Sequence, residues 1–429
     1  MRIITLIFCG TVLVNCSRVI GSLPVPAGMP IDNTYATEAG RLLTVHSRTV
    51  TGYESLYSFR GATDGANPHA GLTIVNGTLY GTTEHGGNDP SGNCGAEGCG
   101  SVFALNLPSG QERVLYSFQG QGNGYSDGSG PAAGLIDVKG TLYGTTQFGG
   151  GGVGTVFSFK LSSGYESVLY SFEGGTDGEL PLAGLITRNS MLYGTTSEGG
   201  CISGYCGSIY GTVFEVSTTY GTESVVHSFG SGSDGRFPIA GLIDVKGTLY
   251  GTTLGGGGSG CRHGDGCGTV FEVSTSGTER VLYSFKGGTD GSGPATGLID
   301  VNGMLYGTTA SGGAKGNGTV FEVSSSGSEK VLYSFKGRKD GSEPEAGLID
   351  VKGTLYGTTA LGGANSEGTV FKITTTGVEN VLHSFKGGTD GAWPDAGLVA
   401  AKGALYGTTV SGGGYGPSGG NGTIFRISP

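Results

Sequence analysis

Residues 305–309 read Leu-Tyr-Gly-Thr-Thr, and this string, with the same five residues, occurs seven times in a chain of 429 residues. Its tyrosines are Tyr80, Tyr143, Tyr193, Tyr250, Tyr306, Tyr356 and Tyr406. Six intervals separate Tyr80 from Tyr406, so the mean period is about 54 residues. Self-similarity at this period indicates a repeat fold in which each copy is one structural unit.

Each unit holds four short runs rich in β-branched and aromatic residues, separated by Gly, Asn, Asp and Ser. In the copy around residue 305, the pattern predicts strands at residues 297–301, 304–309, 318–323 and 331–335. Asn302-Gly303 is typical of a two-residue hairpin turn between the first two strands. Four-stranded units repeated seven times predict an all-β fold, a seven-bladed β-propeller with antiparallel blades.

The two ends of the repeat region are complementary. The first recognisable strand, residues 54–59, is a fourth strand without the other three, and the last, residues 423–427, is a third strand without a fourth. We therefore expect the N-terminal strand to complete the last blade and close a ring over residues 51–429. An open solenoid would not need such complementary strands.

Composition excludes one class of partner. The chain has 91 Gly, only 14% charged residues, a net charge of −10 and no basic block. Nucleic-acid binding depends on Lys and Arg that neutralise phosphates, so we expect no nucleic-acid partner. We expect a monomer.

The N-terminus predicts export. Arg2 and the apolar residues 3–14 resemble a secretory signal, which we assign to residues 1–21, followed by a linker over 22–50. A second processing outcome stays open, because Leu13-Val14-Asn15-Cys16 resembles a lipobox, with a lipoprotein signal at 1–15 and a lipid on Cys16. Either outcome gives an extracellular, periplasmic or surface location, with membrane association only through that lipid.

Six further cysteines form three close pairs within Gly-rich loops: Cys94/Cys99, Cys201/Cys206 and Cys261/Cys267. In an exported chain, this spacing predicts three local disulfides. Tetrahedral metal sites more often use Cys-x-x-Cys pairs, so we expect no metal here and no cofactor.

The segment 318–335, with Gly-Thr-Val-Phe-Glu-Val and Val-Leu-Tyr-Ser-Phe, resembles the outer hairpin of quinoprotein-type propeller repeats. The whole unit resembles the GloVer tandem repeat of the choice-of-anchor family of exported bacterial proteins. This resemblance implies a secreted or surface location and brings no catalytic residues. The quinone cofactor is not carried over, because quinone enzymes use tryptophan-rich blades and this chain has only Trp393.

Antiparallel strands place the loops between second and third strands on the same face as the crossovers between blades. We expect every length difference and every cysteine pair to fall in those second-to-third loops, which makes this face the functional one. Each crossover also carries an Asp-Gly pair, which is typical of a turn residue rather than a calcium ligand. These aspartates are Asp64, Asp127, Asp177, Asp234, Asp290, Asp340 and Asp390.

Positions at which one blade differs from the others indicate a functional site, because residues needed only for packing should be alike in every blade. Before each innermost strand stand His69, Ala132, Leu182, Ile239, Ala295, Glu345 and Asp395. The polar members belong to blades six, seven and one, which adjoin after closure, and the same sector carries Glu343, Trp393, Asn67, Glu84 and His85. We take His69, Glu345, Asp395, Trp393, Glu343 and His85 as the candidate ligand-binding residues.

Two functions fit such a sector. The first is a binding or interaction module for a glycan, a surface polymer or a protein, which needs no nucleophile and no base. The alternative is an extracellular polysaccharide-active hydrolase or lyase that uses Glu345, Asp395 and His69. Near-identical blades and small loops favour the binding module, and no catalytic residue is assigned.

Overall fold

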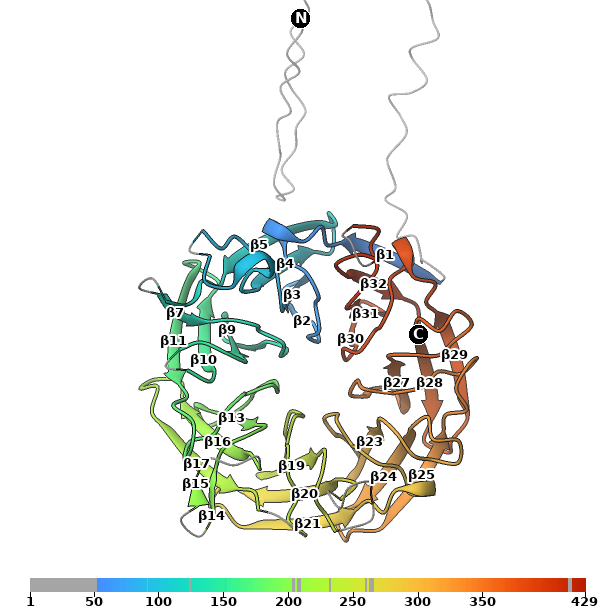
Figure 1. The fold of residues 1–429 in the computed structure, drawn as a ribbon. Coiled ribbons are helices and arrows are strands. Elements are labelled where there is room, and N and C mark those ends of the chain that lie inside the picture. Colours follow the sequence, from blue (N-terminus) through green and yellow to red (C-terminus); the bar gives the residue numbers. More distant parts are fainter. Residues whose placement is uncertain are drawn as a thin grey trace, which may run out of the picture. The chain divides into compact units, whose positions relative to one another are not determined.

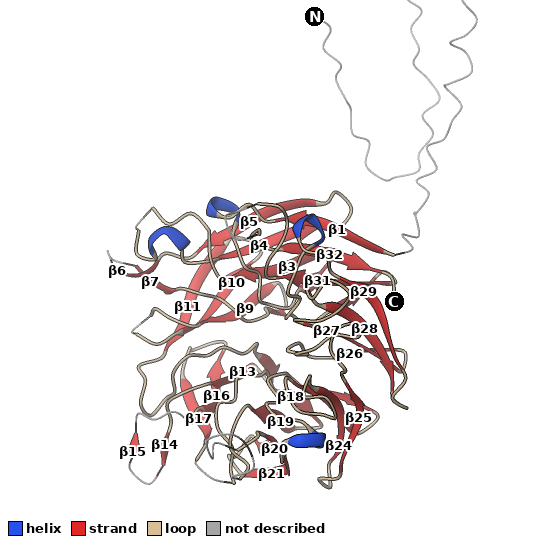
Figure 2. Ribbon diagram, turned by 45° about the vertical axis from the view of Figure 1, so that its right-hand side comes forward, coloured by secondary structure: helices blue, strands red, loops and turns tan. Residues whose placement is uncertain are grey.

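The computed structural model describes residues 52–429, apart from 91, 123–124, 151, 203–204, 207–209, 231–232, 259–260, 262–265 and 416–418. The predicted signal segment 1–21, the linker 22–50 and the lipidation candidate Cys16 lie outside the described residues. Within them, seven four-stranded antiparallel sheets stand in a ring around one axis, and we use the word channel for the position of this axis (Figure 1). The only helices among the described residues are short 3₁₀ turns (Figure 2): η2 (Ala62–Asp64), η3 (Gly95–Glu97), η5 (Gly288–Asp290) and η6 (Gly388–Asp390).

Each blade runs from an innermost strand a to an outermost strand d. The a strands are β2 (Thr73–Val75), β8 (Ile136–Val138), β12 (Ile186–Arg188), β18 (Ile243–Val245), β22 (Ile299–Val301), β26 (Ile349–Val351) and β30 (Val399–Ala401). The b strands are β3 (Thr78–Thr83), β9 (Thr141–Thr146), β13 (Met191–Thr196), β19 (Thr248–Thr253), β23 (Met304–Thr309), β27 (Thr354–Thr359) and β31 (Ala404–Thr409). The Leu-Tyr-Gly-Thr-Thr strings thus form the b strands.

The outer half of each blade holds the other two strands. The c strands are β4 (Ser101–Asn106), β10 (Thr155–Lys160), β16 (Thr212–Ser217), β20 (Thr269–Ser274), β24 (Thr319–Ser324), β28 (Thr369–Thr374) and β32 (Thr423–Ile427). The d strands are β5 (Gln111–Ser117), β11 (Tyr165–Ser171), β17 (Glu223–Ser228), β21 (Glu279–Ser284), β25 (Glu329–Ser334), β29 (Glu379–Ser384) and β1 (Tyr53–Ser58). Blade one is β2–β5, and the numbering follows the chain.

The N-terminal strand closes the ring, as predicted. Strand β1 pairs with β32 in antiparallel register, with Tyr53 opposite Ile427 and Ser58 opposite Thr423. The last sheet therefore has the order β1-β32-β31-β30 and joins both ends of the propeller (Figure 1). In this sheet, β1 covers the edge that β32 would otherwise expose.

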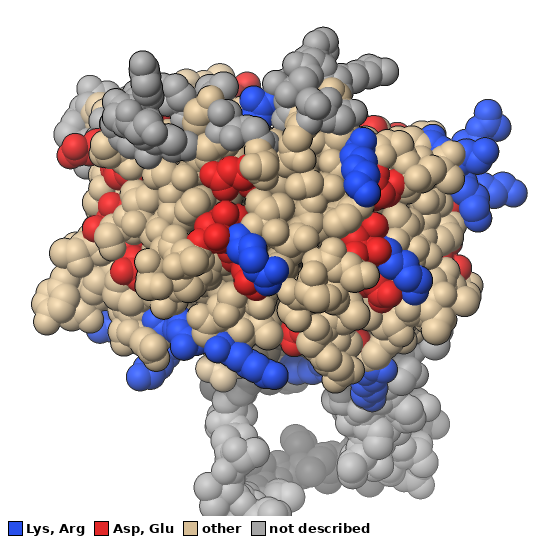
Figure 3. Space-filling model, turned by 90° about the horizontal axis from the view of Figure 1, so that it is seen from below, with Lys and Arg blue, Asp and Glu red and all other residues tan. Residues whose placement is uncertain are grey.

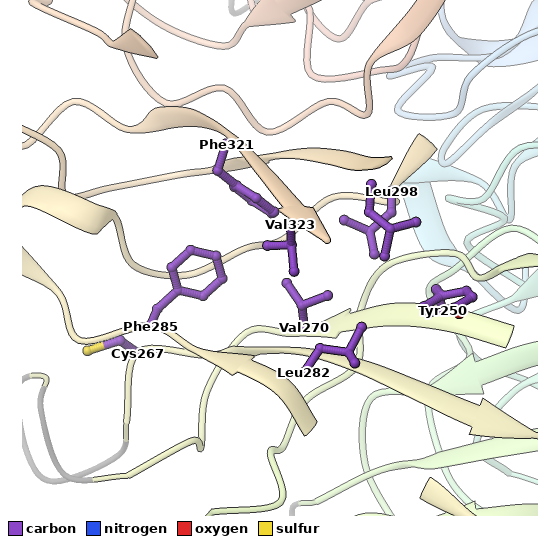
Figure 4. Close-up of a cluster of buried hydrophobic side chains, with 9 residues drawn as sticks. Tyr250, Cys267, Val270, Leu282, Phe285, Leu298, Phe321 and Val323 are labelled. Carbon is purple, nitrogen blue, oxygen red and sulfur yellow. The ribbon is translucent and has the colours of Figure 1, made fainter. Parts of the chain in front are cut away.

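The hydrophobic core lies between neighbouring blades. Figure 4 shows one of these clusters, in which Val270, Leu282 and Phe285 of blade four face Phe321 and Val323 of blade five. The Phe285 and Phe321 rings meet edge to face at 5.1 Å between centroids. Comparable clusters occupy the other junctions, so the core repeats with the blades.

The glycine of each Leu-Tyr-Gly-Thr-Thr string makes room for that phenylalanine. A Cβ on Gly307 would lie 2.6 Å from Cζ of Phe321 and 2.9 Å from Cδ2 of Leu298. Real Cβ atoms do not approach neighbours this closely, so the ring can cross the sheet only where the side chain is absent. The glycine of Leu-Tyr-Gly-Thr-Thr on strand b and the phenylalanine of Gly-Thr-Val-Phe on strand c therefore pack directly against each other.

The two threonines of each string form buried hydrogen bonds in addition to packing. The first reaches the next blade, and at the closure Thr408 Oγ1 donates to the carbonyl of Ala70 at 3.2 Å. The second links strands b and c, as in the 2.8 Å contact between the hydroxyls of Thr309 and Thr319. These bonds satisfy polar groups that would otherwise be costly to bury.

One expectation about the loops is wrong. From Phe118 to Asp127 the first crossover spans nine positions, whereas Phe172 to Asp177 spans five, so length differences are not confined to loops between strands b and c. The extra residues pair as a small hairpin of β6 (Gly120–Gly122) and β7 (Tyr125–Gly128). A hairpin satisfies its own backbone, so a crossover accommodates the insertion without disturbing the blades.

Two of the three predicted disulfides are present, Cys94–Cys99 and Cys261–Cys267. Cys201 and Cys206 lie directly opposite each other in the hairpin of β14 (Cys201–Ile202) and β15 (Tyr205–Cys206). Their side chains lie outside the described part of the structure, so this third bond stays a prediction.

The aspartate of each crossover is a turn residue, as predicted, and it also has a partner on strand d. Asp290 accepts hydrogen bonds from the backbone N–H of Lys286 at 2.9 Å and from the Tyr283 hydroxyl at 2.8 Å. Equivalent pairs at 2.7 Å join Tyr57 to Asp64 and Tyr333 to Asp340. Seven positions separate the tyrosine from the aspartate in these three pairs, and the hydrogen bond holds each crossover to the outer strand that precedes it.

Candidate functional site

The crossovers and the loops between strands b and c meet on one face of the propeller. Short antiparallel bridges join them, for example Ala66 with His85 and Ala392 with Ser411. The proline of each crossover is preceded by a residue whose backbone N–H donates to the loop of the previous blade, as Trp393 does to Glu367 at 3.1 Å. The sequence positions on either side of this proline therefore lie at the mouth of the channel, just before strand a.

The structure brings His69 and Asp395 into contact across the closure. Nδ1 of His69 lies 3.0 Å from Oδ2 of Asp395, and Nε2 lies 3.0 Å from Oε2 of Glu84. His69 comes from blade one, Asp395 from blade seven, and Glu84 follows the b strand of blade one. Both imidazole nitrogens are therefore held between carboxylates, which fixes the plane of the ring.

The electrostatics of this clamp keep His69 positively charged. Burial alone would lower the pKa of His69, but hydrogen bonds and charge from Asp395 and Glu84 outweigh it and raise the pKa to about 10. The hydrogen bond from His69 in turn lowers the pKa of Glu84. At neutral pH the cluster is an imidazolium between two carboxylates.

Two further groups extend the clamp toward blades one and two. His85 lies 3.8 Å from Glu84 through Nδ1 and 3.5 Å from the exposed Glu97 through Nε2. The Gln147 side-chain amide of blade two donates to Oε1 of Glu84 at 3.1 Å. Glu84 therefore has three neighbours and is the hub of the cluster.

On the other side of His69, blade six contributes Glu343 and Glu345, and both are exposed. The surrounding residues partly desolvate the Glu345 carboxyl although the side chain as a whole is exposed, and this desolvation, followed by the charges of Asp395 and Glu343, raises the pKa of Glu345. No ion pair links Glu345 to His69 among the described residues, so Glu345 stands beside the clamp and not in it.

Trp393 lies at the exposed rim of the same sector. Its side chain is 47% exposed, and its backbone has φ of +58°, a conformation in which side chains are rare. Its carbonyl accepts the N–H of Val410 at 3.0 Å, which fixes the turn. Two other blades have glycine at this position, Gly130 and Gly293, whereas blade four has Phe237.

Sequence reasoning placed Glu84 in this sector but outside the candidate set, and it missed Gln147. The signal that identifies both is the residue after each Leu-Tyr-Gly-Thr-Thr string. These residues are Glu84, Gln147, Ser197, Leu254, Ala310, Ala360 and Val410. The longest polar side chains of this set stand in blades one and two, beside His69.

Charge on the outside of the ring is mixed. On the side seen in Figure 3, Lys and Arg side chains line the lower edge and also stand beside Asp and Glu side chains in the middle. Among the described residues, no helix is long and apolar enough to cross a membrane.

The repeated four-stranded blades and the channel-mouth cluster define a β-propeller repeat protein. A model of the Gloeobacter/Verrucomicrobia repeat matches residues 32–263 and 262–429. The chain belongs to this repeat family, in agreement with the resemblance seen in its repeat motifs. No curated protein matches the chain.

Solved structures with the same architecture share little sequence with it. An oligogalacturonate lyase from Vibrio parahaemolyticus is 10% identical, covers 89% of this chain and 94% of its own, and has a TM-score of 0.52. An oligogalacturonate lyase in complex with manganese is also 10% identical, with 88% and 96% covered and a TM-score of 0.52. A nidogen/laminin complex gives 15% identity, 67% and 91% coverage and a TM-score of 0.41. At this identity the likeness concerns the fold alone.

Proposed function

We propose that this protein is an exported propeller that binds a glycan at the channel mouth, in the sector formed by blades six, seven and one. The observation that carries the proposal is the His69 clamp, an imidazolium held at 3.0 Å from both Asp395 and Glu84. Convergent polar groups can orient a ligand, and the same crossover carries an exposed aromatic side chain, Trp393, two residues before Asp395. The disulfides Cys94–Cys99 and Cys261–Cys267 support an oxidising location outside the cytoplasm.

The charge of the sector narrows the class of glycan. Glu84 and Asp395 contact the His69 imidazolium, and Glu345 lies near enough to Asp395 and Glu343 for their charges to act on it, so carboxyl groups outnumber the imidazolium in this sector. Carboxylates accept hydrogen bonds from hydroxyl or ammonium groups and repel acidic sugars. The ligand is therefore a neutral or amino-sugar polymer, with Trp393 stacked on a sugar face.

The alternative, a polysaccharide hydrolase or lyase, needs a group that moves a proton. Glu345 favours it, because burial raises the pKa of this carboxyl while the side chain stays exposed. His69 weighs against a lyase, because both of its nitrogens are engaged and its pKa of about 10 leaves it protonated. Binding without turnover is the better supported function.

The experiment is a panel of neutral, amino-sugar and acidic polysaccharides, read by binding and by product release. Trp393→Gly should lose binding, since Gly130 and Gly293 show that the turn accepts glycine. Phe237→Gly removes an aromatic side chain from the same repeat position in blade four and should bind as the wild type does. Equal loss in both variants, or a preference for acidic polymers, would refute the site; product release abolished by Glu345→Gln would establish the enzyme instead.

A further inference from the structure

A three-residue cluster recurs at the outer rim of the blade junctions. A tyrosine on strand d donates its hydroxyl to the aspartate of the following crossover, and a glutamate from strand d of the next blade faces both. At the junction of blades four and five these residues are Tyr283, Asp290 and Glu329, with 2.8 Å between the hydroxyl and Oδ2 of Asp290. The tyrosine proton thus lies between two carboxylates that would otherwise repel each other.

The junction of blades three and four departs from this pattern. Strand β17 carries His227 where five other blades carry Tyr57, Tyr116, Tyr170, Tyr283 and Tyr333. His227 keeps the aspartate and the glutamate as neighbours, here Asp234 and Glu279. Nε2 of His227 lies 3.4 Å from Oδ1 of Asp234, without the geometry of a hydrogen bond.

Nε2 of His227, Oδ1 of Asp234 and Oε1 of Glu279 are buried at this junction and have no hydrogen-bond partner. The corresponding carboxylate oxygens are also unpaired at tyrosine junctions, as at Asp290 and Glu329, so the imidazole nitrogen is what this junction adds. One ring nitrogen of His227 and one carboxylate oxygen each of Asp234 and Glu279 lie within 4.8 Å of one another. The second oxygen of Asp234 is already used, because the N–H of Gly230 donates to it at 2.6 Å. An imidazole nitrogen can offer a lone pair to a cation at this position, whereas the tyrosine hydroxyl of the other blades donates a proton to the aspartate.

We propose that His227, Asp234 and Glu279 bind a divalent transition-metal ion that joins blade three to blade four. One imidazole nitrogen and two carboxylate oxygens are a donor set suited to Zn²⁺ or Mn²⁺, with water in the remaining positions. Two ligands bound about 2.1 Å from a tetrahedral zinc are about 3.4 Å apart, the separation already present between His227 and Asp234. The metal takes the place of the tyrosine proton used at the other junctions.

Two comparisons within the chain separate this site from a general acidic cluster. At the junction of blades six and seven, His383 also replaces tyrosine, but Tyr53 stands in place of the glutamate and stacks on the imidazole at 3.8 Å. That junction has one carboxylate fewer. The second group of three potential metal ligands among the described residues, Asp89 with Cys94 and Cys99, has its two sulfurs joined in a disulfide.

The test measures metal binding by the full chain, purified under non-reducing conditions and stripped with a chelator. Calorimetry with Zn²⁺ and with Mn²⁺, and elemental analysis after dialysis, should give about one bound ion per chain. His227→Tyr restores the residue that five blades already use, so it should fold normally and lose that ion. Asp234→Asn should weaken binding at least about tenfold while keeping the shape of the turn.

His383→Tyr is the matched control, since it makes the same substitution at the junction without the glutamate, and it should bind metal as the wild type does. The proposal is overturned if His227→Tyr retains the wild-type ion, or if the wild type binds no more metal than His227→Tyr. A melting temperature of His227→Tyr close to that of the metal-free wild type shows that lost binding is not lost folding. A response to Ca²⁺ alone would also contradict the proposed donor chemistry.

Discussion

The same residue type takes opposite protonation states at different places in this ring. Hydrogen bonds and charge from Asp395 and Glu84 outweigh burial and raise the pKa of His69 to about 10. Burial lowers the pKa of His383, although Asp390 lies 3.0 Å from its Nε2. Two carboxylates are enough to keep an imidazole charged at the channel mouth, whereas one does not compensate for burial at the rim.

This difference predicts the outcome of Asp395→Asn. The substitution removes one of the two charges that stabilise the His69 imidazolium, so the pKa of His69 should fall from about 10 toward its ordinary value. The contribution of the clamp to stability is fully present below about pH 6.5 and is lost as the pH rises through the folded pKa.

Nitrogen-detected NMR titration of the imidazoles checks this prediction, with His69→Gln to assign the signal. His383 is the internal control, because Asp395 makes no contact with it in the described structure, and its titration should stay unchanged. A His69 that titrates near its ordinary value in the wild type would contradict the clamp.

At the scale of elements, the ring depends on a strand that comes from the opposite end of the chain. Strand β1 lies opposite Ile427, Phe425 and Thr423 of β32 and brings Phe59 into the next junction. Phe59 meets Phe103 of blade one at 5.1 Å. The strand therefore contributes both an edge and part of a core.

Removal of residues up to 59 should destabilise the last blade. The edge of β32 would be left unpaired and the junction with blade one would lose Phe59, so we expect aggregation or a large fall in melting temperature. A variant that begins at residue 52 keeps β1 and is the control, with an expected melting temperature close to that of the full chain. A soluble monomer of unchanged stability after loss of β1 would refute closure by this strand.

At the scale of the whole molecule, partly buried glutamates at the blade junctions couple stability to pH. Burial, the largest cause in each case, raises the pKa of Glu112, Glu166 and Glu223 to about 7. A carboxyl whose pKa is raised in the folded state favours folding when protonated. This contribution is fully present below about pH 4.5 and is lost as the pH rises through about 7.

We therefore expect the melting temperature to fall between about pH 4.5 and pH 7.5 through these groups. The triple variant Glu112→Gln, Glu166→Gln, Glu223→Gln cannot ionise there, so its curve should be flatter and its advantage over the wild type should grow with pH. Calorimetric scans at several pH values measure both curves. Parallel curves would show that these carboxyls titrate normally in the folded protein.

The sequence alone determined the blades. Each Leu-Tyr-Gly-Thr-Thr string predicts a strand, and the Asn302-Gly303 pair predicts a turn. Seven copies with complementary ends predict a closed ring. Local sequence preferences are enough to assign the strands because every blade repeats the same packing. A strand that is hard to recognise in one copy can be assigned from the other six. The sector that holds His69 and Asp395 followed from the same alignment of copies.

The contacts that make a site came only from the tertiary structure. Residues 69 and 395 are 326 positions apart, and their 3.0 Å contact depends on how tightly the ring closes. The roles of Glu84 as a hub, of Gln147 beside it, and of Glu279 opposite His227 depend on side chains from neighbouring blades. A repeat pattern fixes which residues share a blade, but the curvature of the ring, set by the packing between blades, decides which of them meet across a junction.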